Sequence, residues 1–189
     1  MIGWMSDSRR IAQADLAALE IVRYPDPRLM EACTSLAREE INDSLCALVE
    51  RMFELMIPAR GVGLAAPQVG IAARLFVASP TMKNDDRHVY VNPRIISADG
   101  WQDGDEGCLS FPGISCKIKR RAEVTIEALD LGGRPFQETA RDLLARIFQH
   151  EIDHLDGKLL VDRMGTIARM GHRTALQQLE EDFQRAAAR

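Results

Sequence analysis

Apolar residues recur every three or four positions in three segments of the chain, a spacing typical of helices that pack one face against a core. The first segment begins at Asn42 or Ser44 and is closed by Pro58. Its repeating positions are Leu45, Leu48, Val49, Met52, Phe53 and Met56. The last segment follows Arg163 and predicts an amphipathic C-terminal helix over residues 166–189.

The remaining segment predicts a helix between Thr139 and Gly157. Thr139 can act as the N-cap, Asp142 can complete a variant capping box, and Gly157 stands where a glycine ends many helices. Apolar residues cover most of the circumference of this helix. It is therefore expected to be buried between other layers of the fold.

Strands are predicted between these helices, in segments that are rich in Val, Ile and Leu. The segments are residues 74–79, 89–97 and 123–130. Leu131-Gly132-Gly133 has the composition of a hairpin turn that leads into a further strand around Phe136. β-structure thus dominates the middle of the chain, and helices lie at both ends.

Composition indicates an ordinary globular chain with a single domain, residues 1–189, of which 46% are hydrophobic and 28% charged. The formal net charge of -4 gives no global electrostatic case for binding nucleic acid or an anionic membrane. The basic cluster at 117–121 is expected to be a solvated strand edge. No apolar run approaches the ~20 residues that span a bilayer. The N-terminus lacks the apolar region of a secretory signal, which favours the cytoplasm and predicts a largely loose extension over residues 1–18.

Candidate chemistry centres on His150-Glu151-Ile152-Asp153-His154, which has the pattern H-E-x-x-H inside the predicted buried helix. Histidines four positions apart lie one turn from each other on one helical face, so both imidazoles can reach a single metal ion. Glu151 lies on the same side and can act on a metal-bound water. Burying these groups without partners would cost several kcal/mol. A bound metal removes that objection.

A tetrahedral metal requires a further ligand from elsewhere in the chain. His88 and His172 are candidates, but Cys108 lies in a more unusual segment, after a glycine and the turn-rich residues 103–105. From spacing alone, a buried thiol without a metal is an equally good interpretation of Cys108. The four cysteines contain no C-x-x-C pair, so thiols are expected rather than disulfides.

Three segments together resemble the signature motifs of peptide deformylases, in the order and approximate spacing of that family. They are Gly61-Val62-Gly63-Leu64-Ala65-Ala66-Pro67-Gln68, Glu106-Gly107-Cys108-Leu109-Ser110 and His150-Glu151-Ile152-Asp153-His154. The resemblance runs from about Leu19 to Arg163 and leaves the N-terminal extension and the C-terminal tail unexplained. Each motif alone is modestly specific, whereas the three together are very specific.

The resemblance implies an α+β fold, with mostly antiparallel β-sheets wrapped around a central metal-binding α-helix and a C-terminal helix. It implies a hydrolase that removes the formyl group from the N-terminal formylmethionine of newly synthesised polypeptides and releases formate. Its partners would be N-formylmethionyl peptides and nascent chains, and the C-terminal helix could contact the ribosome. The implied cofactor is one divalent metal ion, Fe²⁺, which Zn²⁺, Ni²⁺ or Co²⁺ can replace.

The resemblance also implies a role for individual residues. The metal ligands carry over to Cys108, His150 and His154. Glu151 carries over as the catalytic acid/base, which accepts a proton from water and delivers it to the departing amine. Gln68 and the backbone N–H of Leu109 would stabilise the negative formyl oxygen. The metal itself would lower the pKa of its water from 15.7 towards ~7.

Substrate contacts are implied at three positions of the same motifs. Gly63 would offer its backbone to the peptide, and Val62 and Leu143 would help to line the methionine pocket. Arg146 falls beside that pocket, where an apolar residue is expected. Asp153 could orient a liganding histidine, or it could form a structural salt bridge.

Other functions fit parts of the pattern. An H-E-x-x-H metallopeptidase usually takes its further ligand downstream as Glu or His, and no strong candidate follows Gly157. A structural zinc site usually fills four positions with protein, and no fourth ligand of comparable quality is found. A deformylase-like enzyme that acts on another N-acyl group remains an alternative that motifs alone do not exclude.

Overall fold

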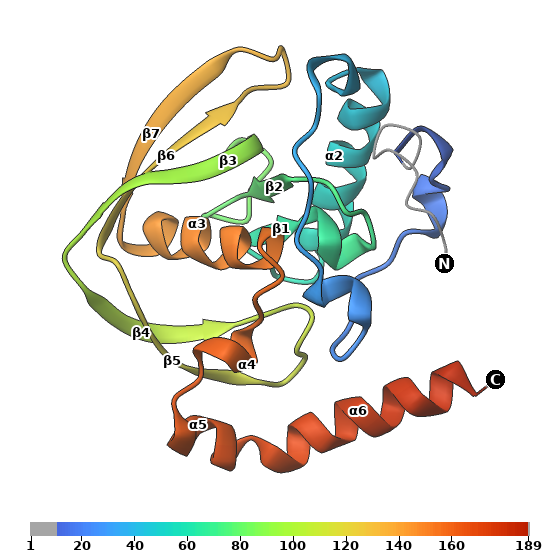
Figure 1. Cartoon of the computed structure of the whole chain (residues 1–189), viewed down its shortest axis with the longest axis vertical. Helices are drawn as coiled ribbons and strands as arrows, with labels where there is room; N and C mark the ends of the chain where they lie inside the picture. Colours follow the sequence, from blue (N-terminus) through green and yellow to red (C-terminus); the bar gives the residue numbers. More distant parts are fainter. Residues whose placement is uncertain (1–10, 189) are drawn as a thin grey trace.

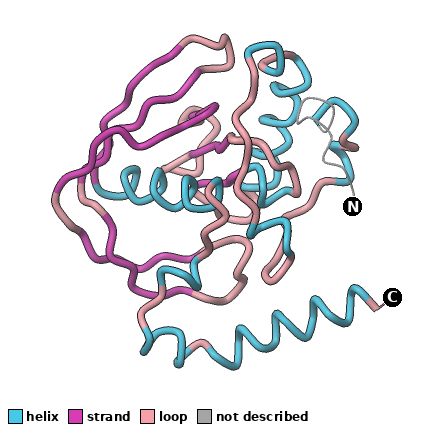
Figure 2. The backbone as a smooth tube through the Cα atoms, viewed as in Figure 1, coloured by secondary structure: helices cyan, strands magenta, loops and turns pink. Residues whose placement is uncertain are grey.

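One helix, α3 (Asp142–Leu155), crosses the centre of the molecule between two β-structures (Figure 1). The computed structural model describes residues 11–188 of the chain. A five-stranded antiparallel sheet lies on one side of α3, and a two-stranded hairpin lies on the other (Figure 2). Every side chain from Ala145 to Leu155 is buried. The expected α+β fold around a central helix is confirmed.

Strands occupy the middle of the chain, and helices precede and follow them. The strands are β1 (Gly63–Ala65), β2 (Leu75–Ala78), β3 (His88–Asp99), β4 (Gln102–Gly107), β5 (Ser115–Arg120), β6 (Glu123–Leu129) and β7 (Pro135–Arg141). The five-stranded sheet has the strand order β1-β2-β3-β6-β7, and β4 and β5 form the hairpin. Further α-helices include α2 (Asp43–Met56), α4 (Leu160–Arg163), α5 (Thr166–Gly171) and α6 (Arg173–Ala187). The 3₁₀ helices of the described part are η1 (Leu16–Ala18), η2 (Pro27–Met30), η3 (Arg38–Glu40) and η4 (Ala66–Val69). Within the described residues, none of these helices has the length and apolar character needed to cross a membrane.

Strand β2 joins two parts of the hydrophobic core, because side chains alternate between the two faces of a strand. Leu75 and Val77 belong to the cluster that contains the apolar face of α2. Phe76 and Ala78 belong to the cluster that contains the apolar face of α3. The ring of Phe76 stacks on that of Tyr90, with 4.6 Å between the centroids. The sheet therefore fixes α3 from one side and leaves its other side for the hairpin.

Most of the predicted elements are confirmed. Helix α2 has Asn42 as its N-cap, and the Asn42 side chain accepts hydrogen bonds from the N–H groups of Ser44 and Leu45. Gly157 follows α3 with a φ of 70°, the left-handed conformation that ends many helices. The predicted strands correspond to β2, β3, β6 and β7.

The predicted start of α3 is wrong. Thr139 lies in β7, where it pairs with Thr125 of β6, and the helix begins at Asp142. Pairing between the two strands continues to Arg141, opposite Glu123. The sheet, and not a capping side chain, decides where this helix begins.

The turn predicted at residues 103–105 is also wrong, because these residues belong to β4. Asp103 pairs with Lys119 and Asp105 pairs with Lys117 across the hairpin. Opposite charges on facing positions favour such a pairing. Gly104 is left on the opposite face, which is turned towards α3.

Both ends of the chain depart from expectation. The predicted C-terminal helix is two helices, α5 and α6, separated at His172. A glycine inside a helix costs about 1 kcal/mol relative to alanine, and Gly171 precedes the break. Ile167 and Met170, which were expected on the apolar face of the predicted C-terminal helix, lie on α5 and are 88% and 72% exposed. In the N-terminal extension, Ile11 is buried in the same core cluster as α2, so the extension is not loose there. Its first ten residues, and residue 189, lie outside the described part of the chain.

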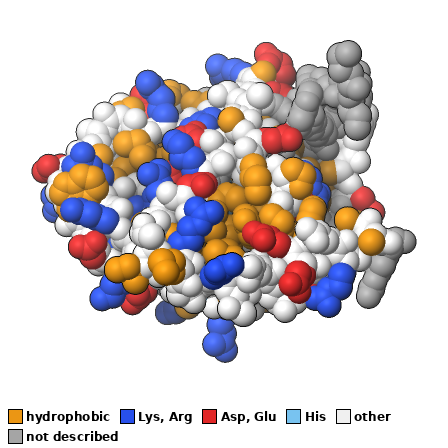
Figure 3. Space-filling model, turned by 60° about the horizontal axis from the view of Figure 1, so that its bottom comes forward, with side chains coloured by type: hydrophobic (Ala, Val, Ile, Leu, Met, Phe, Trp, Pro, Cys, Tyr) orange, Lys and Arg blue, Asp and Glu red, His pale blue; other side chains and the backbone are white. Residues whose placement is uncertain are grey.

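Helix α6 is attached to the rest of the molecule by few contacts. Leu176 is its one buried residue in the described part, and the hydroxyl of Tyr24 donates a hydrogen bond to Glu180 at 2.9 Å. The helix runs along one end of the molecule (Figure 1). On the face that carries α5 and α6, acidic and basic side chains are interspersed around an apolar area (Figure 3).

Candidate active site

Three side chains offer metal-binding atoms at one point of the molecule. One ligand atom from each of Cys108, His150 and His154 lies within 4.8 Å of the others. The Sγ atom of Cys108 is 3.2 Å from Nε2 of His154. The histidines lie one turn apart on α3, and Cys108 directly follows β4. A thiolate and two imidazoles are ligands that zinc and other transition metals accept, and three protein ligands leave a position open.

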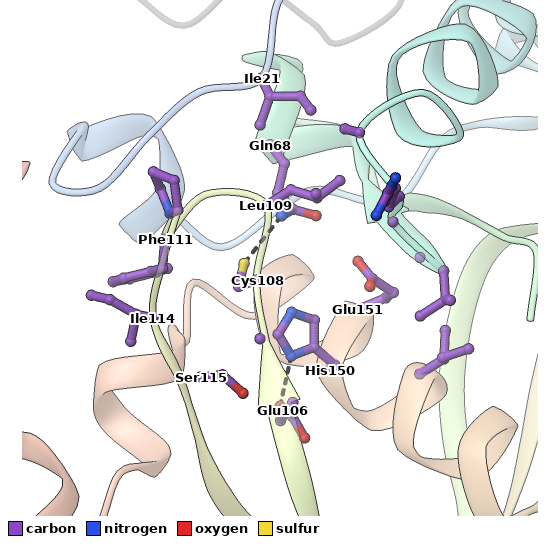
Figure 4. A pocket seen from close by; sticks show the side chains of 18 of the residues that line it. Ile21, Gln68, Glu106, Cys108, Leu109, Phe111, Ile114, Ser115, His150 and Glu151 are labelled. Carbon is purple, nitrogen blue, oxygen red and sulfur yellow. Dashed lines mark hydrogen bonds and ion pairs between the residues drawn. The ribbon is translucent and has the colours of Figure 1, made fainter. Parts of the chain in front are cut away.

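His150 is oriented by a carboxylate that the sequence motifs contain without an assigned role. Nδ1 of His150 lies 2.7 Å from Oε1 of Glu106, which leaves Nε2 to face the other ligands (Figure 4). A carboxylate behind a histidine fixes the ring and makes it a better ligand. Glu106 lies in β4 two residues before Cys108, and the sequence contained no separate signal for its role.

Glu106 belongs to a buried network of charges. Arg120 donates to both of its carboxylate oxygens, at 2.6 and 3.0 Å, and to Asp153 at 2.5 Å. Burial alone would raise the pKa of Glu106, but the hydrogen bonds from His150 and Arg120 hold that pKa well below its usual range.

Two sequence predictions are resolved by this network. Arg120 is 4% exposed, so the prediction of a solvated basic strand edge is wrong for this residue and holds for the exposed Lys117 and Lys119. Asp153 forms ion pairs with Arg120 and Arg163. Of the two roles considered for Asp153, the structure therefore shows the structural salt bridge.

Glu151 points into the same cavity from α3 (Figure 4). It is 3% exposed, and burial raises its pKa to about 7, a rise that the nearby His150 opposes. Space for its carboxylate exists because residue 63 is a glycine. A Cβ atom on Gly63 would lie 2.3 Å from Oε1 of Glu151. Gly63 is therefore required sterically beside Glu151, which the sequence did not indicate.

The amide of Gln68 is held at the edge of the metal-binding group. Its Oε1 accepts a hydrogen bond from the N–H of Ala65 at 2.8 Å. Its Nε2 donates to Oγ of Ser110 at 3.2 Å and to Sγ of Cys108 at 3.4 Å. The amide nitrogen is thus held beside the sulfur of Cys108 (Figure 4). Ser110 is a further polar contact without a role in the sequence analysis.

A cavity of about 770 Å³ connects these groups. Every residue expected to bind substrate lines it: Val62, Gly63, Gln68, Leu109 and Leu143. Arg146 also lines the cavity, so a charged residue does stand where an apolar one was expected. The volume is within the range typical of sites for small molecules and peptides.

Comparison with known proteins points the same way. The family model of polypeptide deformylases matches residues 18–170. The peptide deformylase of Acidobacterium capsulatum is 46% identical over 151 residues, which are 79% of this chain and 88% of that protein. The peptide deformylase of Thermodesulfovibrio yellowstonii is 44% identical over 156 residues, 82% of this chain and 93% of its own.

Solved structures of peptide deformylases have the same fold. That of a plant enzyme superposes with a TM-score of 0.87 at 38% identity, and the match covers 91% of this chain and 94% of the plant chain. That of the Legionella pneumophila enzyme gives 0.80 at 42% identity, with 90% and 98% covered. The chain therefore belongs to the peptide deformylase family, metal-dependent hydrolases that remove the formyl group from the N-terminus of newly made polypeptides.

Proposed function

We propose that Cys108, His150 and His154 hold one divalent metal ion, Fe²⁺, which Zn²⁺, Ni²⁺ or Co²⁺ can replace. The observation that carries this proposal is the convergence of their three ligand atoms within 4.8 Å, beside Glu151 and Gln68 in one cavity. Among the described residues, no fourth His, Cys, Asp or Glu joins this group. A structural zinc site would require one.

Glu151 acts as the general acid/base. When bound, the metal polarises the formyl oxygen and makes water acidic enough to react at neutral pH. The Glu151 carboxylate takes a proton from the attacking water and later delivers it to the amine that leaves as the C–N bond breaks. Burial supports this role, because a carboxyl group with a pKa near 7 can both accept and return a proton at neutral pH.

Two donors stabilise the negative charge that develops on the formyl oxygen. They are Nε2 of Gln68 and the backbone N–H of Leu109, which come from η4 and from the segment after β4. One such donor is typically worth about 2.7–4 kcal/mol in the transition state. Gln68 supports this role because its Oε1 is fixed by the N–H of Ala65, which keeps Nε2, the donor end of the amide, beside Cys108.

The substrate is an N-formylmethionyl peptide or nascent chain, which we expect this enzyme to meet in the cytoplasm. Gly63 contacts its backbone, and Val62 and Leu143 contact the methionine side chain. Leu143 is 47% exposed, as a residue at the entrance of a binding pocket would be. We also propose a contact with the ribosome through α6, because this helix runs along one end of the molecule with few contacts to it.

Hydrolysis of formyl-Met-Ala-Ser and acetyl-Met-Ala-Ser by the iron form under anaerobic conditions, or by the cobalt or nickel form, tests the proposal. We expect formate release at least tenfold faster than acetate release, with the peptide bonds intact by mass spectrometry. A formyl carbon carries only hydrogen, so a crowded site admits it and excludes a larger acyl group. Cleavage between Met and Ala would instead indicate a metallopeptidase, and equal rates for the two substrates would indicate a broader N-acyl hydrolase.

A further inference from the structure

Arg146 is a buried cation in the wall of the cavity, beside several apolar residues. It lies on α3 one turn before His150 and shares the cavity with Val62, Leu143 and Ile147. Only 7% of its surface is exposed. A guanidinium stays charged at any accessible pH, so its burial has to be compensated by fixed acceptors.

One half of the guanidinium has such acceptors. Nη1 of Arg146 donates to Oε2 of Glu106 at 3.0 Å and to the carbonyl oxygen of Ile118 at 3.0 Å. These acceptors lie on β4 and β5, so the side chain bridges from α3 to the hairpin. Nη2 is buried and has no hydrogen-bond partner among the described residues. The group is thus held from one end and is not free to swing out of the wall.

Gly104 of β4 provides the space for the Nη2 side of the Arg146 guanidinium. A Cβ atom at this position would lie 2.9 Å from Nη2 and 3.2 Å from Cζ of Arg146. Gly104 and Glu106 share one face of β4 because side chains alternate along a strand. The guanidinium therefore occupies the volume that any side chain at position 104 would fill, and the backbone of β4 prevents it from retreating.

We propose that Arg146, seated on Gly104, determines how long a substrate's first side chain can be. This inference rests on the proposed function, which places that side chain between Val62 and Leu143. Arg146 lies on α3 one turn before the ligand His150, and its bonds to Glu106 and Ile118 make it a rigid part of the cavity wall. On this proposal, an unbranched side chain of four atoms, such as that of methionine, ends against this wall. A longer side chain meets a charged group that can move only by breaking its bonds to Glu106 and Ile118.

The link through Glu106 adds a consequence for the rate. One oxygen of Glu106 bonds Arg146 and the other bonds His150. A side chain that displaces Arg146 therefore also disturbs the carboxylate that orients a metal ligand. Overlong substrates are expected to lower kcat as well as to raise KM.

The test measures kcat/KM for formyl-Xaa-Ala-Ser, where Xaa is norleucine or its straight-chain homologue with two more methylenes. The wild-type enzyme should prefer norleucine by at least tenfold, since a single methylene is typically worth 10–200-fold in a closed apolar pocket. In Arg146→Ala the end of the pocket is open, and the preference should fall to threefold or less. Arg74→Ala removes another arginine that is partly buried and ion-paired, outside the cavity, and should keep the wild-type preference.

A second variant changes the residue behind the Arg146 guanidinium. Gly104→Ala adds a methyl group under the guanidinium and pushes it towards the cavity. Norvaline is one methylene shorter than norleucine. The ratio of kcat/KM for formyl-norvaline-Ala-Ser to that for formyl-norleucine-Ala-Ser should rise at least fivefold relative to the wild-type enzyme. If Arg146→Ala does not fold, the length preference of Gly104→Ala alone tests the role of Arg146.

An unchanged length preference in the folded variants, or a wild-type enzyme without one, overturns the inference. These outcomes differ from a failure of the proposed function, in which the wild-type enzyme would release no formate from formyl-Met-Ala-Ser.

Discussion

Gly63→Ala would place a methyl group where the carboxylate of Glu151 now lies. The added Cβ would be 2.3 Å from Oε1 and 2.9 Å from Cδ of Glu151, and 3.0 Å from Cγ2 of Ile147. The carboxylate would have to move by about 1 Å to restore ordinary contact, and a displacement of 1 Å can cost about 10²-fold in rate. We therefore expect kcat to fall about 100-fold. Overpacking of this kind also costs typically 1–3 kcal/mol of stability.

The assay is formate release from formyl-Met-Ala-Ser, with metal content and the urea midpoint measured on the same samples. Metal content should stay near one per chain, because none of the three atoms nearest to the added methyl group belongs to a metal ligand. Gly165→Ala is the matched control, since a Cβ atom there meets nothing within 4 Å. A Gly63→Ala variant with its metal and wild-type kcat would refute either the position of Glu151 or its role as acid/base.

Three further substitutions separate catalysis, metal binding and stability. Glu151→Gln should keep its metal and lose about 10²–10⁴-fold in kcat, since it removes only the acid/base group; a near-normal rate would contradict the assignment. Cys108→Ala should lose most of its metal by elemental analysis, whereas Cys46→Ala should retain it; a stoichiometry near one in the Cys108 variant would place the third ligand elsewhere. Arg120→Met removes the cation that the buried Glu106 and Asp153 share, although each keeps one other arginine, and should lower the free energy of unfolding in urea by about 1.5–3 kcal/mol. The exposed Arg134→Met should change that free energy by less than about 1 kcal/mol, and equal effects of the two would show that the buried network contributes little.

The part of the site on α3 could be predicted because helical geometry is local. Positions i and i+4 share a face in any α-helix, so the spacing of His150 and His154 already implied a common metal. Cys108 is different, because nothing in its neighbours states that β4 ends beside α3. Only the resemblance of three motifs to a known family connected segments that are 42 positions apart in the chain (Cys108 to His150).

The errors share a physical cause, which is pairing between distant segments. Residues 103–105 have the composition of a turn, yet cross-strand pairs with Lys117 and Lys119 hold them extended. Arg120 stands in a basic run and looks exposed by composition, but its burial depends on two carboxylates from two other elements. Thr139 is a good N-cap by type and is instead used by β7. In each case a long-range partner outweighed the local preference.

The hairpin β4-β5 has a consequence for how the protein opens locally. A two-stranded ribbon is marginally stable by itself, so this one depends on its apolar contacts and on the bonds from Glu106 and Arg120 to α3. One metal ligand follows β4, whereas the other two lie on a helix fixed by the five-stranded sheet. The two halves of the site thus belong to units with different opening free energies. A ligand that binds only when both halves are closed stabilises the hairpin by mass action, so metal and substrate should each slow amide hydrogen exchange in β4-β5 more than in the sheet.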